Sequence, residues 1–345
     1  MLRRFGKSAA GILGVRQSFF DENAKYLSLA TAQAELYIAQ PRRERCKLCE
    51  ELLPHRPDFV KLTIPYASCR RCGQLNGLHQ DTDAFCSAIY LDESYATYYG
   101  SADEQAYRYR VNAVYRPKID FLAEALGADG HDFTSFRYAD IGSGSGYLVA
   151  ALIDAGIDDC VGLDVSPHQT EYANRMVPGH RCHVIEIAQV APEIRSLDAD
   201  VVSMIGVLEH LQNPRDVLQA LRDNPRVKYL FLCVPLFGLC VFFEMVFPNA
   251  YPRHLVADHT HLFTESSLQW MERAYGLDRR AEWWFGSDML DLYRDILVSL
   301  SQKAEMRDMA ADWMERMRPL IDPMQLAIDE RRLASEAHLV FRIDR

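Results

Sequence analysis

Short apolar runs alternate with longer segments of mixed polarity through the middle of the chain. Five such runs fall at residues 136–139, 160–165, 181–187, 200–206 and 228–234. Each has the length of a buried strand, and the segments between them have the length of helices. Strands that alternate with helices of about 10–15 residues argue for a parallel, doubly wound sheet. The pattern therefore predicts an α/β fold.

The C-terminal third adds two predicted strands and a long insertion between them. The strands are expected at residues 280–285 and 338–343. The intervening segment, roughly residues 288–335, carries apolar residues such as Met306 and Ala310 at steps of three and four, which predicts helices. We expect this insertion to form a helical cap or a dimer surface, with a solvated decoration as the alternative.

The N-terminal hundred residues differ in character from the rest. Residues 17–40 are amphipathic and compatible with a helix, which Pro41 ends. A chain of 345 residues has room for a second small module beside a full domain, on a prior of about 150 residues per domain. We therefore divide the chain into a helical segment (1–41), a small module (42–100) and a main domain (101–345).

Charge and hydropathy limit the partners. The formal net charge is −10, and a nucleic-acid binder usually carries a basic surface, so we expect no nucleic-acid substrate. The longest apolar run, residues 229–243, is interrupted by Pro235 and falls short of the roughly 20 residues that span a bilayer. We expect residues 236–247 to form an apolar loop or lid, with peripheral contact to a lipid-linked substrate as a second interpretation. Residues 1–16 show no convincing secretory signal, so we expect a cytoplasmic protein.

Four of the nine cysteines form two C-x₂-C pairs, Cys46 with Cys49 and Cys69 with Cys72. The 19 residues between the pairs fit the spacing of a zinc ribbon. Each pair supplies two thiolates from a tight turn, and a closed site of four thiolates holds Zn²⁺ in a structural role. The alternative is four reduced cysteines without a metal. The odd total argues against a disulfide framework.

The segment from Asp140 to Gly146 reads Asp-Ile-Gly-Ser-Gly-Ser-Gly and lies between a predicted strand and a helix. A glycine-rich turn there brings backbone N–H groups close to a ligand. The spacing fails the dinucleotide pattern Gly-x-Gly-x-x-Gly, and no lysine supports a phosphate-binding loop. An acid two residues before three alternating glycines resembles motif I of the class I S-adenosylmethionine (SAM) methyltransferases.

Two further segments strengthen this resemblance. Asp164 ends the next strand, 18 residues beyond Gly146, where such folds place a carboxylate for the ribose hydroxyls. Residues 207–214 resemble the family's Leu-Glu-His-Leu motif after its fourth strand. The resemblance covers roughly residues 104–286 and the last strand, and it implies a Rossmann-like sheet of seven strands with SAM as the cofactor.

The resemblance also implies which residues bind the cofactor. For Asp140, a structural role beneath the glycine turn is as plausible as contact with the ammonium group of SAM. For Tyr99, contact with the cofactor or substrate competes with simple packing between the modules. The expected cofactor-binding residues are Asp140, Gly142, Ser143, Gly144, Gly146, Tyr147, Asp164, Val165, Gly206 and Tyr99.

A four-cysteine module before a SAM-binding domain resembles the sugar C-methyltransferases of deoxysugar and surface-polysaccharide pathways. In that family an aromatic segment follows the zinc module, and Tyr99-Gly100-Ser101 looks like its Tyr-x-Ser element. The resemblance implies that Asp258 and His259 take the places of the family's acid and base, and that His210 matches its histidine after strand four. The acid here is Asp instead of Glu, and the family's extra C-terminal domain looks absent. These departures favour O-methylation over C-methylation, with N-methylation behind.

Methyl transfer to a hydroxyl needs a base, and histidine suits that task near neutral pH. The candidate catalytic residues are His259, His210, Asp258, Glu209 and His261. Each histidine taken singly has an alternative as a loop or capping residue. The His-x-His spacing of His259 and His261 also suggests a metal, but no third ligand presents itself in the sequence, so we expect no catalytic metal.

These observations predict a SAM-dependent methyltransferase with structural Zn²⁺, acting on a sugar or a sugar-derived small molecule. A nearby alternative is a lipid-linked or polymeric glycan as acceptor. A different class is a non-catalytic scaffold that combines a zinc ribbon with a SAM-type fold. The acceptor and the oligomeric state stay open, with a homodimer as one expectation.

Overall fold

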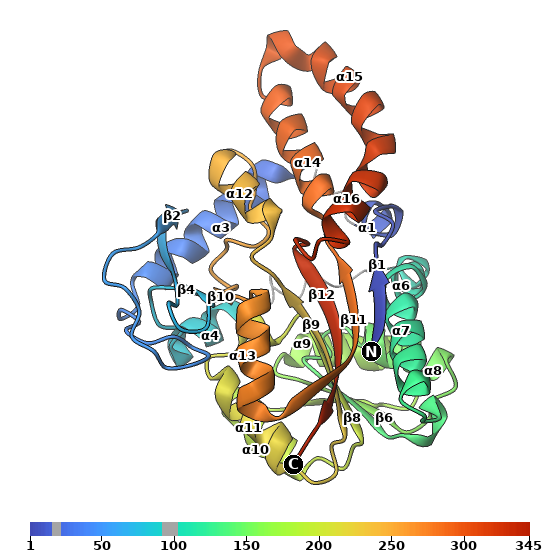
Figure 1. The fold of residues 1–345 in the computed structure, drawn as a ribbon. Coiled ribbons are helices and arrows are strands. Elements are labelled where there is room, and N and C mark those ends of the chain that lie inside the picture. The colour runs from blue at the N-terminus through green and yellow to red at the C-terminus, as the bar shows by residue number, and fades with distance from the viewer. Residues whose placement is uncertain (16–21, 92–102) are drawn as a thin grey trace.

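The computed structural model describes residues 1–15, 22–91 and 103–345. A large twisted sheet forms the centre of the molecule, a small sheet lies beside it, and a group of helices projects from one end (Figure 1). Within the described ranges, no helix combines the length and the apolar character that a membrane crossing requires.

The central sheet has eight strands in the order β1-β11-β12-β9-β8-β5-β6-β7. Strands β5 to β9 pair in parallel, and β12 runs antiparallel to both of its neighbours. The strands are β1 (Leu2–Phe5), β5 (Tyr138–Ile141), β6 (Cys160–Asp164), β7 (Cys182–Val184), β8 (Val201–Ile205), β9 (Tyr229–Pro235), β11 (Leu277–Phe285) and β12 (Glu336–Ile343). All seven predicted strands are present, and the α/β fold is confirmed.

The eighth strand, β1, corrects the prediction that residues 1–41 are a helical segment. It pairs in parallel with β11 along Leu2–Phe5. Its two arginines hide its strand character in the sequence. In the fold, Arg3 forms an ion pair of 3.1 Å with the buried carboxylate of Glu282, and the Trp283 indole donates to the Gly6 carbonyl at 2.8 Å. The strand thus depends on partners almost 280 residues away in the chain.

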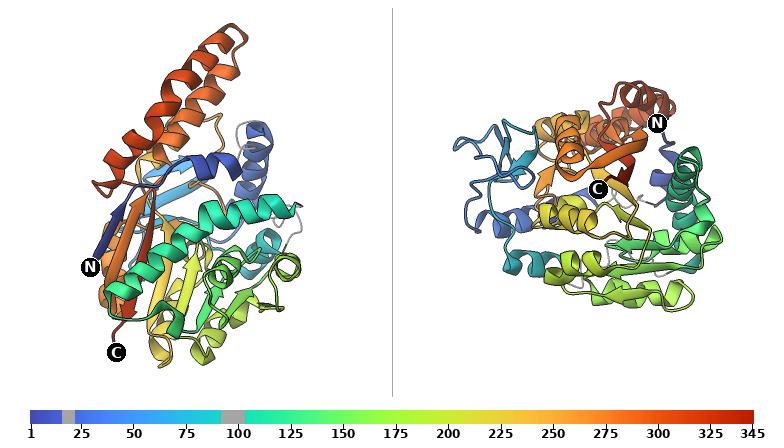
Figure 2. Two further views of the ribbon diagram at one scale, coloured as in Figure 1. Left: turned by 90° about the vertical axis from the view of Figure 1, so that its right-hand side faces the viewer. Right: turned by 60° about the horizontal axis from the view of Figure 1, so that its bottom comes forward.

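Helices cover both faces of the central sheet (Figure 2). Helices α7, α8 and α9 pack on one face, whereas α10, α11 and α13 pack on the other. The flanking helices are α6 (Glu104–Arg110), the π-helix η1 (Val111–Tyr115), α7 (Arg116–Ala128), α8 (Tyr147–Asp154), α9 (Pro167–Met176), α10 (Val190–Ser196), α11 (Pro214–Asp223) and α13 (Glu265–Tyr275), with 3₁₀ turns η2 (Phe133–Ser135), η3 (Ile187–Gln189) and η4 (Leu208–His210).

The small antiparallel sheet has the order β10-β4-β3-β2. Its strands are β2 (Phe59–Lys61), β3 (Ile64–Ser68), β4 (Leu75–Gly77) and β10 (His261–Leu262). Strand β10 belongs to the methyltransferase-like region, so this sheet crosses the boundary predicted near residue 100. Two helices, α3 (Asn23–Ile38) and α4 (Asp83–Tyr90), share the apolar core of this sheet. Helix α3 confirms most of the amphipathic helix expected before Pro41; a shorter helix, α1 (Ala10–Val15), precedes it.

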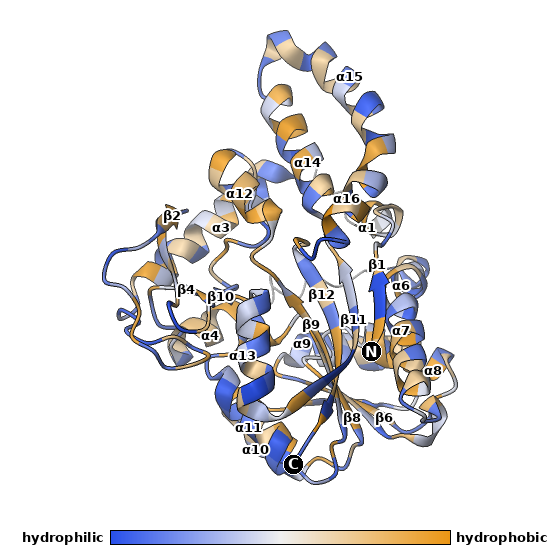
Figure 3. Cartoon of the chain, viewed as in Figure 1, coloured by the Kyte–Doolittle hydropathy of each residue, from blue (hydrophilic) through white to orange (hydrophobic). Residues whose placement is uncertain are grey.

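The predicted insertion is helical and projects from the body of the molecule (Figures 1 and 2). It comprises α14 (Asp288–Ser301), η5 (Ala304–Met306), α15 (Arg307–Met317), η6 (Arg318–Leu320) and α16 (Ile321–Asp329). The apolar segment 236–247, which we expected to be a loop or lid, contains a helix instead, α12 (Leu239–Val246). Figure 3 shows this helix as one of the most apolar, and Phe242 and Val246 on it are exposed.

Candidate active site and cysteine cluster

The four predicted zinc ligands lie together in the small module. All four cysteines are buried, and their sulfur atoms lie within 4.8 Å of one another. The two turns are built alike, because the Glu50 and Gly73 N–H groups donate to the carbonyls of Cys46 and Cys69. Gly73 has a φ of +81°, and Glu50 occupies the matching place with a φ of +60°. This arrangement suits a closed tetrahedral metal site.

The glycine turn follows β5, as predicted, and its backbone requires glycine. Gly142, Gly144 and Gly146 have φ angles of +69°, +50° and +74°, which side chains rarely allow. A Cβ atom on Gly142 would lie only 2.4 Å from Val207. Gly146 forms the N-cap of α8. The N–H groups of Gly142 and Gly144 are donated within the fold, to the Leu163 carbonyl and the Asp164 carboxylate. The turn therefore brings its backbone, without side chains, to the start of a helix, which is a good place for a polar ligand.

Asp164 ends β6 and organises the same turn. Its Oδ2 accepts from the Gly144 N–H at 2.7 Å, and its Oδ1 accepts from the Ser166 N–H at 2.8 Å. Burial raises the pKa of this carboxyl. Each carboxylate oxygen has a second lone pair, so Asp164 can still receive two hydroxyl groups of a ribose.

Asp140 lies beneath the turn. It is buried, its Oδ1 accepts from the Ser203 hydroxyl at 2.7 Å, and it does not line the adjoining cavity. Burial raises its pKa to about 7. Of the two roles left open by the sequence, this geometry is that of a residue that holds the turn.

One large cavity of about 1080 Å³ opens at the carboxyl ends of the parallel strands, where doubly wound folds bind ligands. Gly146, like Asp140, is not among its lining residues. Tyr99 lies outside the described residues. The predicted cofactor residues that line it are Gly142, Ser143, Gly144, Tyr147, Asp164, Val165 and Gly206. The predicted catalytic residues that line it are Glu209, His210, Asp258 and His259.

His210 and His259 lie together at one end of this cavity, which we call the acceptor end, and their ring centres are 5.0 Å apart. The Nδ1 atom of His210 lies 2.8 Å from the Asp258 carbonyl, and that of His259 lies 3.3 Å from the His254 carbonyl. Because a carbonyl only accepts, both Nδ1 atoms carry the proton and both Nε2 atoms keep a lone pair. Burial lowers the pKa of His210 and lowers that of His259 to about 4, so both rings are neutral near pH 7.

Glu209 is the third polar side chain beside the two histidines. Its Oε1 lies 3.9 Å from Nε2 of His210, and its Oε2 has no hydrogen-bond partner among the described residues. Only 2% of Glu209 is exposed, and burial raises its pKa to about 8. One ligand atom each from Glu209, His210 and His259 falls within a common distance of 4.8 Å. The sequence suggested a metal at His259 and His261 without a third ligand, whereas the fold brings Glu209 and His210, both from η4, to His259.

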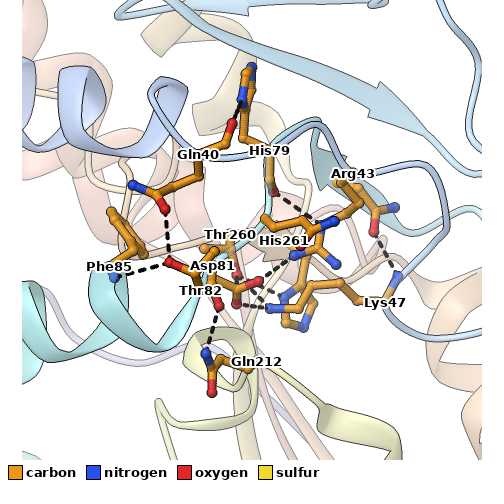
Figure 4. Close-up of polar contacts among 12 residues, drawn as sticks. Gln40, Arg43, Lys47, His79, Asp81, Thr82, Phe85, Gln212, Thr260 and His261 are labelled. Atoms are coloured by element: carbon orange, nitrogen blue, oxygen red, sulfur yellow. Dashed lines mark hydrogen bonds and ion pairs between the residues drawn. The ribbon is translucent and has the colours of Figure 1, made fainter.

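His261 does not join this group, which corrects its place among the catalytic candidates. It lies on β10, is fully buried, and does not line the cavity. It faces instead the polar network around Lys47 and Asp81, shown in Figure 4. Positions two apart on one strand point to the same side, but β10 begins only at His261. His259 lies before the strand, so the two histidines have different surroundings.

The network of Figure 4 ties the cysteine module to the acceptor end. Lys47, which lies between two of the cysteines, is fully buried and forms an ion pair with Asp81. Its ammonium also donates to the Leu211 carbonyl and, at 2.8 Å, to the Thr260 hydroxyl. Arg43 supplies a second cation to Asp81. These bonds fix the segments that follow His210 and His259.

Two residues that support the acceptor end were not predicted from the sequence. Tyr90, at the end of α4, donates to the Asp258 carbonyl at 3.2 Å and contacts the His210 ring edge-on. Glu244, on α12, accepts the backbone N–H groups of residues 253–255 and the His254 ring. Burial opposes ionisation, but these donors outweigh it and hold the pKa of Glu244 at about 2. Tyr90 lies 168 residues from Asp258, whereas Glu244 lies only 9–11 residues from its partners, and no local motif marks either residue.

Comparison with known proteins agrees with this geometry. The family model described as "Methyltransferase domain" matches residues 107–282, slightly more than half of the chain. The tRNA U34 carboxymethyltransferase of Shewanella putrefaciens is 38% identical over 92 residues, which cover 25% of this chain and 27% of that protein. The chain thus spans about a quarter of the length of the curated relatives that it matches.

Solved methyltransferase structures resemble the chain more distantly. The methyltransferase domain of bacterial CtHen1 matches with a TM-score of 0.42 and 16% identity, over 68% of this chain and all of that one. The magnesium protoporphyrin IX methyltransferase of Synechocystis, solved with bound SAH, has a TM-score of 0.41 and 16% identity, over 57% of this chain and 90% of that one. On the family match and its own strand order, the chain belongs to the methyltransferase-domain family and has the Rossmann-like fold of class I SAM-dependent methyltransferases.

Proposed function

We propose that this protein transfers a methyl group from SAM to a hydroxyl oxygen of a sugar or sugar-derived small molecule. One observation carries the proposal: a single cavity combines the glycine turn with two neutral histidines whose Nε2 lone pairs are free to accept. The sugar class rests on the resemblance of the cysteine module and the segment around His259 to sugar methyltransferases. The polar acceptor end, with Arg253 and Glu336 in its lining, suits a hydroxyl-rich molecule.

SAM is the cofactor that the family and the glycine turn support. It supplies an electrophilic methyl group on a sulfonium centre. Gly142 and Gly144 would let it approach the backbone of the turn closely, and the Asp164 carboxylate would accept hydrogen bonds from its ribose hydroxyls. Gly142 has no room for a side chain and keeps the approach to the backbone open.

His259 is the proposed base. Its Nε2 lone pair takes the hydroxyl proton as the acceptor oxygen gains the methyl group, a contribution of about 10²–10⁴-fold. The His254 carbonyl fixes the ring through Nδ1, and the low pKa keeps it unprotonated near pH 7. His210 lies beside it, and Asp258 and Glu209 complete the surroundings of the pair.

An RNA acceptor is a second candidate, because the curated relatives that match are tRNA-modifying enzymes. The net charge of −10 weighs against it, since nucleic-acid binding needs cationic contacts to phosphates. A lipid-linked or polymeric glycan is a variant of the first proposal, and the exposed Phe242 and Val246 of α12 would suit it. A non-catalytic scaffold is the alternative outside the enzymes.

Transfer of label from SAM distinguishes these acceptors. The purified protein is incubated with methyl-labelled SAM and an extract of its source cell, which is then separated into small-molecule, lipid, polysaccharide and RNA fractions. Label in nucleotide-linked or free sugars supports the proposal, provided that the His259→Ala variant leaves those fractions unlabelled. Label confined to RNA would replace the sugar by a nucleoside. SAM binding without label in any fraction would favour the scaffold.

A further inference from the structure

We propose that Glu209, His210 and His259 form a binding site for one divalent transition-metal ion at the acceptor end of the cavity. The site differs from the cysteine cluster in its ligands, which are two imidazoles and a carboxylate. Such sets bind Zn²⁺, Mn²⁺, Fe²⁺ or Co²⁺.

The two imidazoles are oriented as metal ligands are. A metal-bound histidine donates its other ring N–H to a carbonyl or carboxylate, which fixes the ring and the tautomer. His210 and His259 both do so, toward the carbonyls of Asp258 and His254. One nitrogen of each ring and one Glu209 oxygen lie within 4.8 Å of one another, and the Nε2 atom of His210 is 3.9 Å from Oε1 of Glu209.

Glu209 provides an independent sign of a cation-binding site. Its carboxylate is 98% buried, and its Oε2 finds no donor among the described residues. A buried carboxylate oxygen without a donor is costly, and natural proteins satisfy such an atom with a proton, a hydrogen-bond donor or a metal. The nearest histidine, His210, directs Nδ1 at the Asp258 carbonyl, and its Nε2 lies 3.9 Å from Oε1 of Glu209, which is beyond hydrogen-bond distance.

Two other groups of potential metal ligands in the described residues already have a cationic side chain beside them. In the group of Cys233, Glu336 and His338, the Lys118 ammonium lies 2.9 Å from the His338 ring. In the group of Cys240, His254 and Asp291, Arg253 pairs with Asp291 at 3.4 Å. Each of these groups already contains a positive side chain.

The Lys47 ammonium, which lies near the proposed site, is already bound by other groups. The Lys47 ammonium acts on His210 electrostatically, but it is bound by Asp81, Thr260 and the Leu211 carbonyl. The Asp258 carboxylate is the second negative group that acts on both histidines, and it favours a cation there.

The position of the site gives it a use. Glu209, His210 and His259 all line the cavity, and a metal with three protein ligands keeps open positions for an outside oxygen. A sugar offers neighbouring hydroxyls to such positions. This use rests on the proposed function. With the metal bound, His259 would be a ligand, and the proton of the hydroxyl that gains the methyl group would pass to water in the open cavity. Metal binding itself rests only on the geometry.

Metal titration of the full-length protein tests the inference. Mn²⁺ is the first probe because it prefers nitrogen and oxygen ligands to thiolates, and Co²⁺ is the second because its absorption separates thiolate from imidazole ligands. We expect one Mn²⁺ per chain, bound at least about tenfold more tightly than by Glu209→Gln or His259→Ala. The control is His183→Ala, which removes an exposed histidine elsewhere and should bind as the wild type does. SAM affinity reports whether each variant is folded.

Anomalous scattering from Mn²⁺-soaked crystals gives a second measurement that needs no variant. A peak among Glu209, His210 and His259 supports the inference. Equal binding by wild type and Glu209→Gln, or no peak at millimolar Mn²⁺, overturns it and leaves His259 as the proposed base. Metal binding without any methylation of sugars would instead contradict the proposed function and leave the metal site standing.

Discussion

The two ends of the cavity are built in different ways. The cofactor end comes from consecutive turns after β5, β6 and β8, and its contacts run through the backbone, as in the bond from Gly144 to Asp164. The acceptor end combines α4, η4 and residues 253–259, which lie far apart in the chain. The first end belongs to the central sheet alone. The second depends on the cysteine module and α12 to hold its loops, so the two ends should respond differently to the same kind of damage.

The largest expected effect is at the cofactor end. Gly142→Val places side-chain atoms where a Cβ already meets Val207 at 2.4 Å and forces a β-branched residue to a φ of +69°. We expect SAM binding to fall below detection in isothermal titration. Gly127→Ala is the matched control, because a Cβ there meets no atom within 4 Å and α7 tolerates alanine. Retained SAM binding by Gly142→Val would move the cofactor away from this turn.

At the acceptor end, His259→Ala should separate turnover from cofactor binding. We expect turnover to fall about 10²–10⁴-fold, while the Kd for SAM changes by less than about twofold, since His259 belongs to the other end. Single-turnover rates and equilibrium dialysis measure the two quantities. His183→Ala again serves as the control. Unchanged turnover would remove His259 from the chemistry.

Loss of the cysteine cluster should also spare the cofactor end. We propose that Zn²⁺ fills this cluster, so Cys46→Ser should release one Zn²⁺ and lower the melting temperature of the small module first. Turnover should fall with it, because Lys47 and β10 link that module to the acceptor loops. Cys160→Ser changes a buried thiol outside the cluster and should keep the metal. A module that stays folded without metal would contradict the zinc-ribbon interpretation.

Lys47→Met tests the link directly. The substitution removes a fully buried ammonium and leaves Asp81 with one cationic partner, a loss of about 3–5 kcal/mol in free energy of unfolding. Urea unfolding measures this change. Lys25→Met removes a surface ion pair with Glu22 and should cost less than about 1 kcal/mol. Equal effects of the two substitutions would show that the module is not held through Lys47.

The smallest expected effect concerns Asp140. Burial raises its pKa from 3.8 to about 7. The folded chain thus holds a proton that the unfolded chain releases, and the stabilisation present below pH 4 is lost as the pH rises through 7. Between pH 5 and pH 7 this group should lower the free energy of unfolding by about 2 kcal/mol. Asp140→Asn should flatten that slope in urea titrations at the two pH values, and an unchanged slope would assign it to other groups.

Sequence alone was informative where structure is local. A few consecutive residues are enough to recognise the strands, the inserted helices, the glycine turn and the paired cysteines. What it could not provide depends on contacts across the chain. Strand β1 depends on the ion pair with Glu282. His261 points away from the cavity because its strand, β10, pairs with Asn76 of β4. The third ligand, Glu209, lies fifty residues before His259. Neither the hydrophobic periodicity nor the spacing of motifs indicates such contacts between distant segments.

The pairing of β10 with β4 also sets an order of events during synthesis. The first three strands of the small sheet leave the ribosome early, but the fourth follows about 185 residues later, at His261–Leu262. A nascent chain of 100 residues therefore carries the four cysteines but exposes an unpaired sheet edge. Such edges invite association with other chains. This edge stays unpaired until almost the whole methyltransferase region has emerged.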